Sequence, residues 1–352
     1  MTVKGLLNSF DEWRKQEQGL VLATVYETAG STYSKAGARM LINSEGDFQG
    51  MLSGGCLEGD LAERARQVLD SGTAQRVTYD LGLNSEELWG LGVGCDGLMK
   101  IFLQPLQAEN DYAPFRAMLK TYEGDHCEIA VTVLESDSDE IEAGATLLTA
   151  GDKAETFGLS DAAATILLIE ANAALARMAS STSVVQIGEA KADILLALIK
   201  PRPRLLVLGA GLDAEPVTRL AAELGWRITI VDHRPAYIEN GSFDEAEKIV
   251  CCPAAELSGH FDLSGFDAAI VMSHHLETDK TYLAELALTD IRYIGLLGPG
   301  DRRKRLLADL GDASAAIEGR LHGPAGLDIG AVGPAAIALS ILAQAYGEIG
   351  GN

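Results

Sequence analysis

The segment 205–232 constrains the fold more than any other part of the sequence. A predicted strand at 205–208 runs directly into the turn Gly209-Ala210-Gly211-Leu212-Asp213-Ala214, and a predicted helix follows. In a dinucleotide-binding turn of this form, the first glycine permits the tight turn and the second admits a pyrophosphate. The next predicted strand ends in Asp232, 21 residues after Gly211, which is the spacing of an acid that bonds a ribose hydroxyl. Gly209, Gly211 and Asp232 are therefore candidate nucleotide contacts.

Two residues near this turn leave the nature of its ligand open. The carboxylate of Asp232 favours NAD over NADP, although Arg234 partly offsets its charge. Asp213 places a second carboxylate beside the turn, where it opposes a bound pyrophosphate or caps the helix. A Rossmann-like domain that binds no dinucleotide is the alternative interpretation.

The chain divides at Pro201 and Pro203, because two prolines so close together interrupt any helix or ladder. After this point predicted strands alternate with predicted helices, as in βαβ units. Before it the predicted strands are separated mostly by turns, with one strong helix at 57–69. We therefore predict an α/β protein: an α+β domain at 1–200, then a Rossmann-like parallel-sheet domain at 201–352 that ends in a helix.

Composition excludes several classes of protein. With 28 basic and 51 acidic residues the net charge is −23, which disfavours a nucleic-acid binder. The longest apolar runs are shorter than the roughly 18 residues of a membrane span, and the start of the chain lacks a signal-peptide core. The five cysteines include no CxxC pair, which argues against a disulfide framework. We expect a cytoplasmic protein that binds neither membrane nor nucleic acid.

The first domain contains a faint internal repeat. The segment that begins Gly37-Ala38-Arg39-Met40-Leu41 is echoed 107 residues later by Gly144-Ala145-Thr146-Leu147-Leu148. Chance similarity between glycine-rich hairpins is the alternative. If the duplication is real, the difference between copies is informative, because only the first continues into Gly54-Gly55-Cys56.

That Gly-Gly-Cys turn lies between a predicted strand and the helix at 57–69. The two glycines are expected to leave backbone N–H groups uncovered at a helix start, where anions bind. The same field favours the thiolate form of Cys56, which makes it the best candidate ligand or nucleophile among the thiols. The alternative is a tight turn with a small buried cysteine.

Three further groups are candidate functional residues. Cys95 lies in a second glycine-rich turn, Gly92-Val93-Gly94-Cys95. His274 follows a predicted buried strand, at the edge where open α/β sheets bind ligands, and is a candidate acid–base group; a structural role is equally open. Arg302 and Arg303 begin a run of four cations at a helix start, which is a candidate phosphate site or a solvated helix face.

The motifs together resemble the XdhC/CoxI family of xanthine dehydrogenase accessory factors. The resemblance rests on Gly30-Ser31-Thr32, Gly37-Ala38-Arg39-Met40, Ser53-Gly54-Gly55-Cys56-Leu57-Glu58-Gly59, Gly92-Val93-Gly94-Cys95, Met272-Ser273-His274, Tyr293-Ile294-Gly295-Leu296-Leu297-Gly298 and Gly326-Leu327-Asp328-Ile329-Gly330-Ala331. These motifs occur in order and cover both halves of the chain. One departure is Tyr33-Ser34-Lys35-Ala36, where the family usually has prolines.

The resemblance implies a factor that binds the molybdenum cofactor and helps to sulfurate it or insert it into an apo molybdenum hydroxylase. It implies cofactor contacts at Gly54, Gly55, Cys56, Glu58 and Cys95, with Cys56 as a molybdenum ligand or sulfur carrier. A sulfur-donating desulfurase is a second expected partner, and we expect a homodimer. An NAD-dependent oxidoreductase and a scaffold that only binds a partner remain alternatives.

Overall fold

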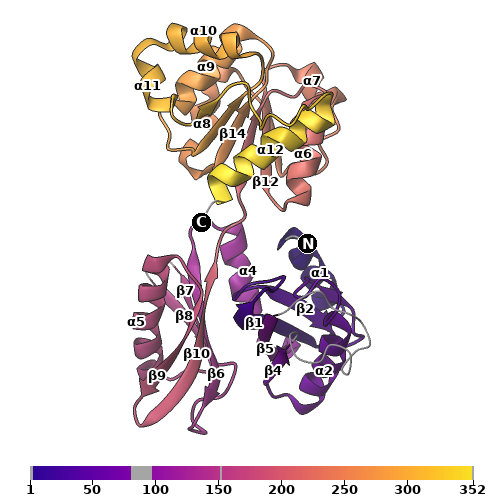
Figure 1. Cartoon of the computed structure of the whole chain (residues 1–352), viewed down its shortest axis with the longest axis vertical. Coiled ribbons are helices and arrows are strands. Elements are labelled where there is room, and N and C mark those ends of the chain that lie inside the picture. Colours follow the sequence, from indigo (N-terminus) through magenta and orange to yellow (C-terminus); the bar gives the residue numbers. More distant parts are fainter. Residues whose placement is uncertain (1–2, 81–96, 151–152, 351–352) are drawn as a thin grey trace. The chain divides into compact units, whose positions relative to one another are not determined.

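The computed structural model describes residues 3–80, 97–150 and 153–350 (Figure 1). The chain forms two compact units, residues 1–201 and 202–352. The first unit holds two five-stranded sheets and the second a six-stranded sheet. This arrangement confirms the predicted fold class, an α+β half followed by a Rossmann-like half.

The first sheet is antiparallel and has the order β3-β2-β1-β5-β4. Helix α2 (Glu58–Ser71) covers one face, because Leu61, Ala65 and Val68 recur at helical spacing and pack on the strands. It ends at Gly72, whose left-handed φ of 67° closes the helix. The strands are β1 (Leu20–Gly30), β2 (Arg39–Asn43), β3 (Phe48–Gln49), β4 (Gln75–Asp80) and β5 (Gly97–Leu106).

Helices α1 (Val3–Lys15) and α4 (Phe115–Glu123) pack with the other face of this sheet around Phe10 and Phe115. The second sheet is also antiparallel, and α5 (Asp161–Arg177) covers one of its faces. Its strands are β6 (Glu128–Ser136), β7 (Thr146–Ala150), β8 (Lys153–Phe157), β9 (Ser181–Ile187) and β10 (Ala190–Ile199).

The two sheets show that the internal repeat is real. The second has the order β8-β7-β6-β10-β9, which is the first order with each strand replaced by its counterpart. The repeat extends to single hydrogen bonds: the N–H of Gly37 donates to Val25 at 2.8 Å, and that of Gly144 donates to Val133 at 2.8 Å. Both glycines have a left-handed φ, 93° and 96°. We call the two halves copy 1 (residues 20–106) and copy 2 (residues 128–199).

The second unit is a parallel sheet of order β13-β12-β11-β14-β15-β16. Its strands are β11 (Arg204–Leu208), β12 (Arg227–Asp232), β13 (Lys248–Cys251), β14 (Ala268–Val271), β15 (Tyr293–Leu296) and β16 (Leu321–His322). Alternate residues of β11 enter opposite cores, Leu205 and Val207 on one face and Leu206 and Leu208 on the other. Both faces are therefore covered, as a parallel sheet requires.

Helices α6 (Ala214–Glu223) and α12 (Pro334–Gly350) pack on one face (Figure 1). The other face carries α8 (Leu257–His260), α9 (Leu276–Leu286), α10 (Gly300–Leu310) and α11 (Ser314–Ile317), and the short α7 (Pro235–Asn240) follows β12. Within the described residues no helix combines the length and apolar character needed to cross a membrane.

Candidate functional site

The Gly-Gly-Cys turn joins β3 to α2 and presents Cys56 to solvent. Gly54 and Gly55 have φ values of 81° and 111°, a region that side chains with a Cβ rarely enter. Leu57, the next residue, is buried and anchors the turn in the core beneath α2. The local sequence thus fixes a tight loop whose one reactive side chain points outward.

The carboxylate of Glu58 occupies the inside of this turn. Its Oε1 accepts the N–H groups of Leu52 and Ser53 at 3.0 and 2.9 Å. Its Oε2 accepts those of Gly55 and Leu57 at 3.0 and 3.2 Å, and the Ser53 hydroxyl at 2.6 Å. The prediction of uncovered amides is therefore wrong for these residues. Among the described residues, the N–H groups of Gly54 and Cys56 have no acceptor.

Glu58 is ionised in this setting although it is buried. Burial opposes its charge, but the hydrogen bonds from the Ser53 hydroxyl and from backbone amides outweigh burial and hold its pKa below the ordinary value. The side chain is only 2% exposed. Glu58 therefore acts as an internal anion that shapes the turn, and we expect it to position Cys56 through the turn.

The loop that follows β1 lies next to the turn. The ring of Tyr33 lies where a Cβ on Gly54 would contact it at 3.5 Å, and the Ser34 hydroxyl donates to the carbonyl of Met51 at 3.2 Å. Gly30, at the end of β1, pairs with Gly97, the first residue of β5. The connection that contains Cys95 leads into Gly97, but Cys95 itself lies outside the described residues.

Two features of copy 1 are absent from copy 2: the Gly-Gly-Cys turn and the long connection between β4 and β5. In copy 2, β8 passes to α5 through Gly158, Leu159 and Ser160, without a Gly-Gly-Cys sequence. Strands β9 and β10 are joined by Gly188 and Glu189 alone, whereas residues 81–96 join β4 to β5. The two copies have the same fold, so that fold requires neither the Gly-Gly-Cys turn nor the long connection between β4 and β5.

In the second unit, contacts within the protein hold the turn that begins at Gly209. Gly209 has a φ of 129°, and a Cβ there would lie 2.4 Å from the carbonyl oxygen of Met272. The carboxylate of Asp232 is fully buried and accepts the Ala210 N–H at 2.7 Å. It also accepts the Arg234 guanidinium at 2.9 and 2.7 Å. The oxygens expected to reach a ribose are therefore engaged within the protein.

Burial disfavours the charge of Asp232, but its hydrogen bonds with Arg234 and Ala210 outweigh burial and lower its pKa. The Arg234 guanidinium in turn lies over the Tyr237 ring, 3.7 Å from its centroid. The signal of the Asp232–Arg234 ion pair in the sequence is the Asp-x-Arg spacing. From the sequence, Arg234 is expected only to offset the charge of Asp232.

Asp213 and His274 form a hydrogen bond over the same turn. His274 Nε2 lies 2.7 Å from Asp213 Oδ2. A Cβ on Gly211 would lie 2.6 Å from Asp213 Oδ1 and 3.8 Å from the His274 ring. The carboxylate thus stands beside the second glycine, where a pyrophosphate would approach. His274 adopts a left-handed φ of 61°, a conformation that costs a non-glycine residue about 1 kcal/mol or more.

The remaining candidates of this unit have structural partners. Arg302 donates to the buried carboxylate of Asp279 at 2.6 Å, and Arg303 donates to the carbonyls of Leu321 and Glu318, both at 3.2 Å. His275, beside His274, caps α9 by accepting the Thr278 N–H at 3.4 Å. The four cations therefore do not converge on one anion site. Lys304 and Arg305 remain exposed, each near an acidic residue of its own helix.

These contacts give a test of the glycine turn. We expect Asp213→Ser to raise the affinity of the chain for ADP at least about fivefold. The substitution removes a negative charge beside Gly211, where the phosphates of ADP would bind. Titration calorimetry with ADP measures the change. Asp244→Ser is the matched control, since it removes an exposed carboxylate from the same unit. Equal affinities in the two variants would show that the position of the charge is irrelevant.

Comparison with known proteins gives matches in both units. The family model described as "XdhC and CoxI family" matches residues 13–80, and the one described as "XdhC Rossmann domain" matches residues 205–345. A Bacillus subtilis protein named as a probable xanthine dehydrogenase subunit is 32% identical over 343 residues, which covers 95% of this chain and 94% of the relative. The "Molybdenum cofactor insertion chaperone PaoD" of Escherichia coli is 28% identical over 106 residues, 30% of this chain and 31% of that protein.

A crystal structure described as a xanthine dehydrogenase from Bacillus halodurans has the same fold. It superposes with a TM-score of 0.79 and 27% identity, and the match covers 99% of this chain and 96% of that one. The motifs, the duplicated first unit and the Rossmann-type second unit agree with these matches. The chain therefore belongs to the XdhC and CoxI family.

Proposed function

We propose that this chain is an accessory protein for molybdenum enzymes that holds the molybdenum cofactor as cargo at the Cys56 turn. The observation that carries the proposal is the exposed thiol of Cys56 on a turn that the buried Glu58 carboxylate organises. The matched relative named as a molybdenum cofactor insertion chaperone supports the role. The Gly-Gly-Cys sequence occurs in copy 1 and not in copy 2, which supports copy 1 as the location of the cargo site.

The residues at this end have the chemistry that the cargo needs. A cysteine thiolate is a soft ligand suited to molybdenum. No acceptor among the described residues takes the N–H groups of Gly54 and Cys56, so they can bind an anionic group. The exposed Lys35 adds a positive charge on the neighbouring loop. Because Glu58 already fills the inside of the turn, an anionic group of the cargo would bind on the outside of the turn.

The proposal extends to partners. The relative named as a probable xanthine dehydrogenase subunit supports a xanthine dehydrogenase-type molybdenum hydroxylase as the client. A sulfur-donating desulfurase, a homodimer and a cytoplasmic location stay predictions. Co-purification with the apo client and with a desulfurase tests the partners. Size-exclusion chromatography tests the homodimer, and cell fractionation tests the location.

NAD stays a predicted second ligand of the Rossmann-type unit, and we do not build a function on it. The buried Asp232 and the Asp213–His274 pair both disfavour it in the conformation described. Calorimetry with NAD and NADH at millimolar concentration tests this ligand directly. An NAD-dependent oxidoreductase would require measurable binding there.

Cys56→Ser tests the proposed function. We expect the molybdenum and pterin that co-purify anaerobically with the whole chain to fall at least about tenfold, because a hydroxyl is a much weaker ligand than a thiolate for a soft metal. Metal analysis and pterin fluorescence measure the two contents. Cys251→Ser is the matched control, since it removes an exposed thiol from the other unit. Unchanged cargo in Cys56→Ser would contradict the proposal.

A further inference from the structure

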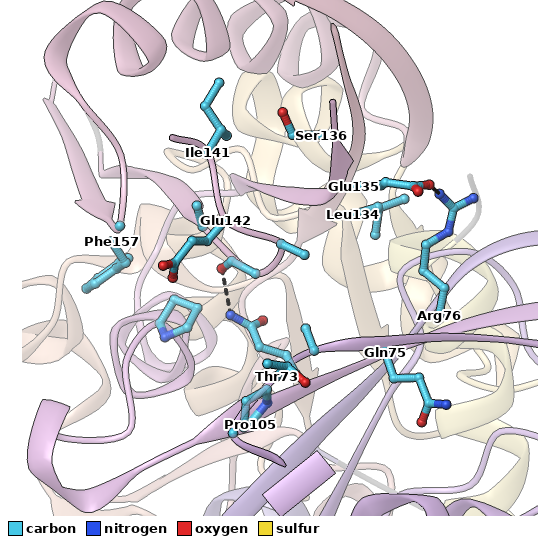
Figure 2. A pocket seen from close by; sticks show the side chains of 18 of the residues that line it. Thr73, Gln75, Arg76, Pro105, Leu134, Glu135, Ser136, Ile141, Glu142 and Phe157 are labelled. Atoms are coloured by element: carbon cyan, nitrogen blue, oxygen red, sulfur yellow. Dashed lines mark hydrogen bonds and ion pairs between the residues drawn. The ribbon is translucent and has the colours of Figure 1, made fainter. Parts of the chain in front are cut away.

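A large cavity lies in the first unit, away from the Cys56 turn. Its volume is about 1180 Å³, and both copies contribute to its wall (Figure 2). Copy 1 contributes residues around Thr73 and Gln104, and copy 2 contributes the β6–β7 loop and Phe157. Gln104 lies at the end of β5 opposite to Gly97, so the cavity and the Cys56 turn occupy opposite ends of the first sheet.

The cavity lies at the end of copy 2 that is equivalent to the Cys56 end of copy 1. The cavity is lined by the β6–β7 loop and by the turn after β8. Their counterparts in copy 1 are the β1–β2 loop, which carries Lys35, and the turn after β3, which carries Cys56. In the β6–β7 loop, the carbonyl of Glu142 accepts the Ala145 N–H at 3.1 Å, just as that of Lys35 accepts the Ala38 N–H at 3.1 Å. Equivalent positions therefore carry opposite charges.

The charges that line the cavity are mostly negative. Three carboxylates line it, those of Glu135, Asp139 and Glu142, against the single cation Arg76. Arg76 is already neutralised by Glu135 and by Asp193, the latter at 3.2 Å. Figure 2 shows the Arg76–Glu135 pair on one side of the view and Glu142 on the other. Within the described residues, the side chains of Glu142 and Asp139 have no ion-pair partner.

A buried amide adds a free acceptor to this wall. Gln104 is 7% exposed, and its Nε2 donates to the carbonyl of Gly144 at 2.7 Å. That bond directs the other end of the amide: Oε1 accepts no hydrogen bond from any residue in the described part of the chain. That oxygen is therefore free to accept an N–H group from a ligand or from water.

We propose that this cavity binds a small organic cation, one with a guanidinium or ammonium group on an apolar body. The Glu142 carboxylate is placed to accept the charged head, and Gln104 Oε1 accepts a further N–H. Apolar side chains that also line the cavity, among them Ile141, Leu134 and Phe157, are suited to an alkyl body. The site is separate from the cargo site and does not depend on Cys56.

The test compares two probes of the same shape on the whole chain. n-Butylguanidinium is expected to bind in the millimolar range by titration calorimetry, more weakly as ionic strength rises. The uncharged n-butylurea is expected not to bind. Glu142→Gln should weaken n-butylguanidinium about three- to fivefold, the effect of one partly solvated ion pair. Glu140→Gln is the matched control, because it removes a carboxylate from the same loop outside the cavity wall.

The outcomes separate the proposal from simple attraction to an acidic protein. Equal weakening by Glu140→Gln and Glu142→Gln would overturn it, as would equal binding of the two probes or no binding of n-butylguanidinium. A Cys56→Ser chain should bind n-butylguanidinium like the unmodified chain. Failure of the cation site would therefore leave the proposed cargo site untouched, and the reverse also holds.

Discussion

Replacing Glu58 with Gln is expected to lower the free energy of unfolding of the first unit by about 3 kcal/mol. The variant keeps one carbonyl acceptor but turns an NH₂ group toward backbone donors, and each buried donor left without a partner costs about 1 to 3 kcal/mol. For a unit of this size the midpoint of thermal unfolding should fall by roughly 6 to 12 °C. Calorimetry of the whole chain measures the shift, and hydrogen exchange in α2 assigns it to the first unit.

Glu63→Gln is the matched control for this prediction. Glu63 lies on the same helix but is exposed, and it pairs with Arg66 at 2.6 Å, so its loss should cost only about 0.5 kcal/mol. The Glu58 variant should also hold less cargo, because the turn no longer presents Cys56 in one conformation. If Glu58→Gln proved as stable as Glu63→Gln, the hydrogen-bonded carboxylate would not organise the turn.

Acid should reduce the difference between the Glu58→Gln variant and the unmodified chain. The folded-state pKa of Glu58 lies below its unfolded value, so the carboxylate contributes its full stability above the unfolded value. That contribution falls as the pH drops through the folded pKa. The two chains should therefore converge in stability under acid conditions.

Asp232→Asn should have a comparable effect confined to the second unit. Breaking a buried ion pair by removing one partner costs about 3 to 5 kcal/mol, and we expect the lower end because the Arg234 side chain keeps 27% of its surface exposed. The Ala210 N–H also loses a charged acceptor. Hydrogen exchange at the turn that begins at Gly209 should rise, with little change in the first unit.

Asp309→Asn serves as the control, since its carboxylate is 40% exposed and lies 4.0 Å from Arg305 on the same helix. The pKa of Asp232 is also lowered on folding, so its stabilisation is present above the unfolded pKa and is lost as the pH falls through the folded one. An Asp232→Asn chain that unfolds like the control would contradict the structural role of this pair.

Many of the strands and helices follow from the sequence pattern. The predicted helix at 57–69 corresponds to α2 (Glu58–Ser71). The sequence pattern does not predict helix α5, because it is apolar on most sides and gives little helical periodicity. Strands β9 and β10 are also not predicted. The repeat, faint in sequence, became clear only from strand order and matched hydrogen bonds.

The candidate sites were less predictable for a physical reason. The spacing of glycines and acids is the same whether a ligand or the protein's own side chain fills a turn. Glu58 fills the Cys56 turn, and Asp213 stands beside Gly211, but only side-chain positions reveal this. In the same way, the cations that begin at Arg302 adjoin in sequence but diverge on the helix.

The duplicated first unit has a consequence for valence. Two copies of one fold offer two equivalent ends, so a chain of this architecture could in principle hold two molecules of the same cargo. Here the thiol turn lies in copy 1 alone, and the equivalent end of copy 2 has a carboxylate where copy 1 has a lysine. Under our proposal each chain is monovalent, and a transfer that empties the Cys56 turn leaves no second cargo molecule behind.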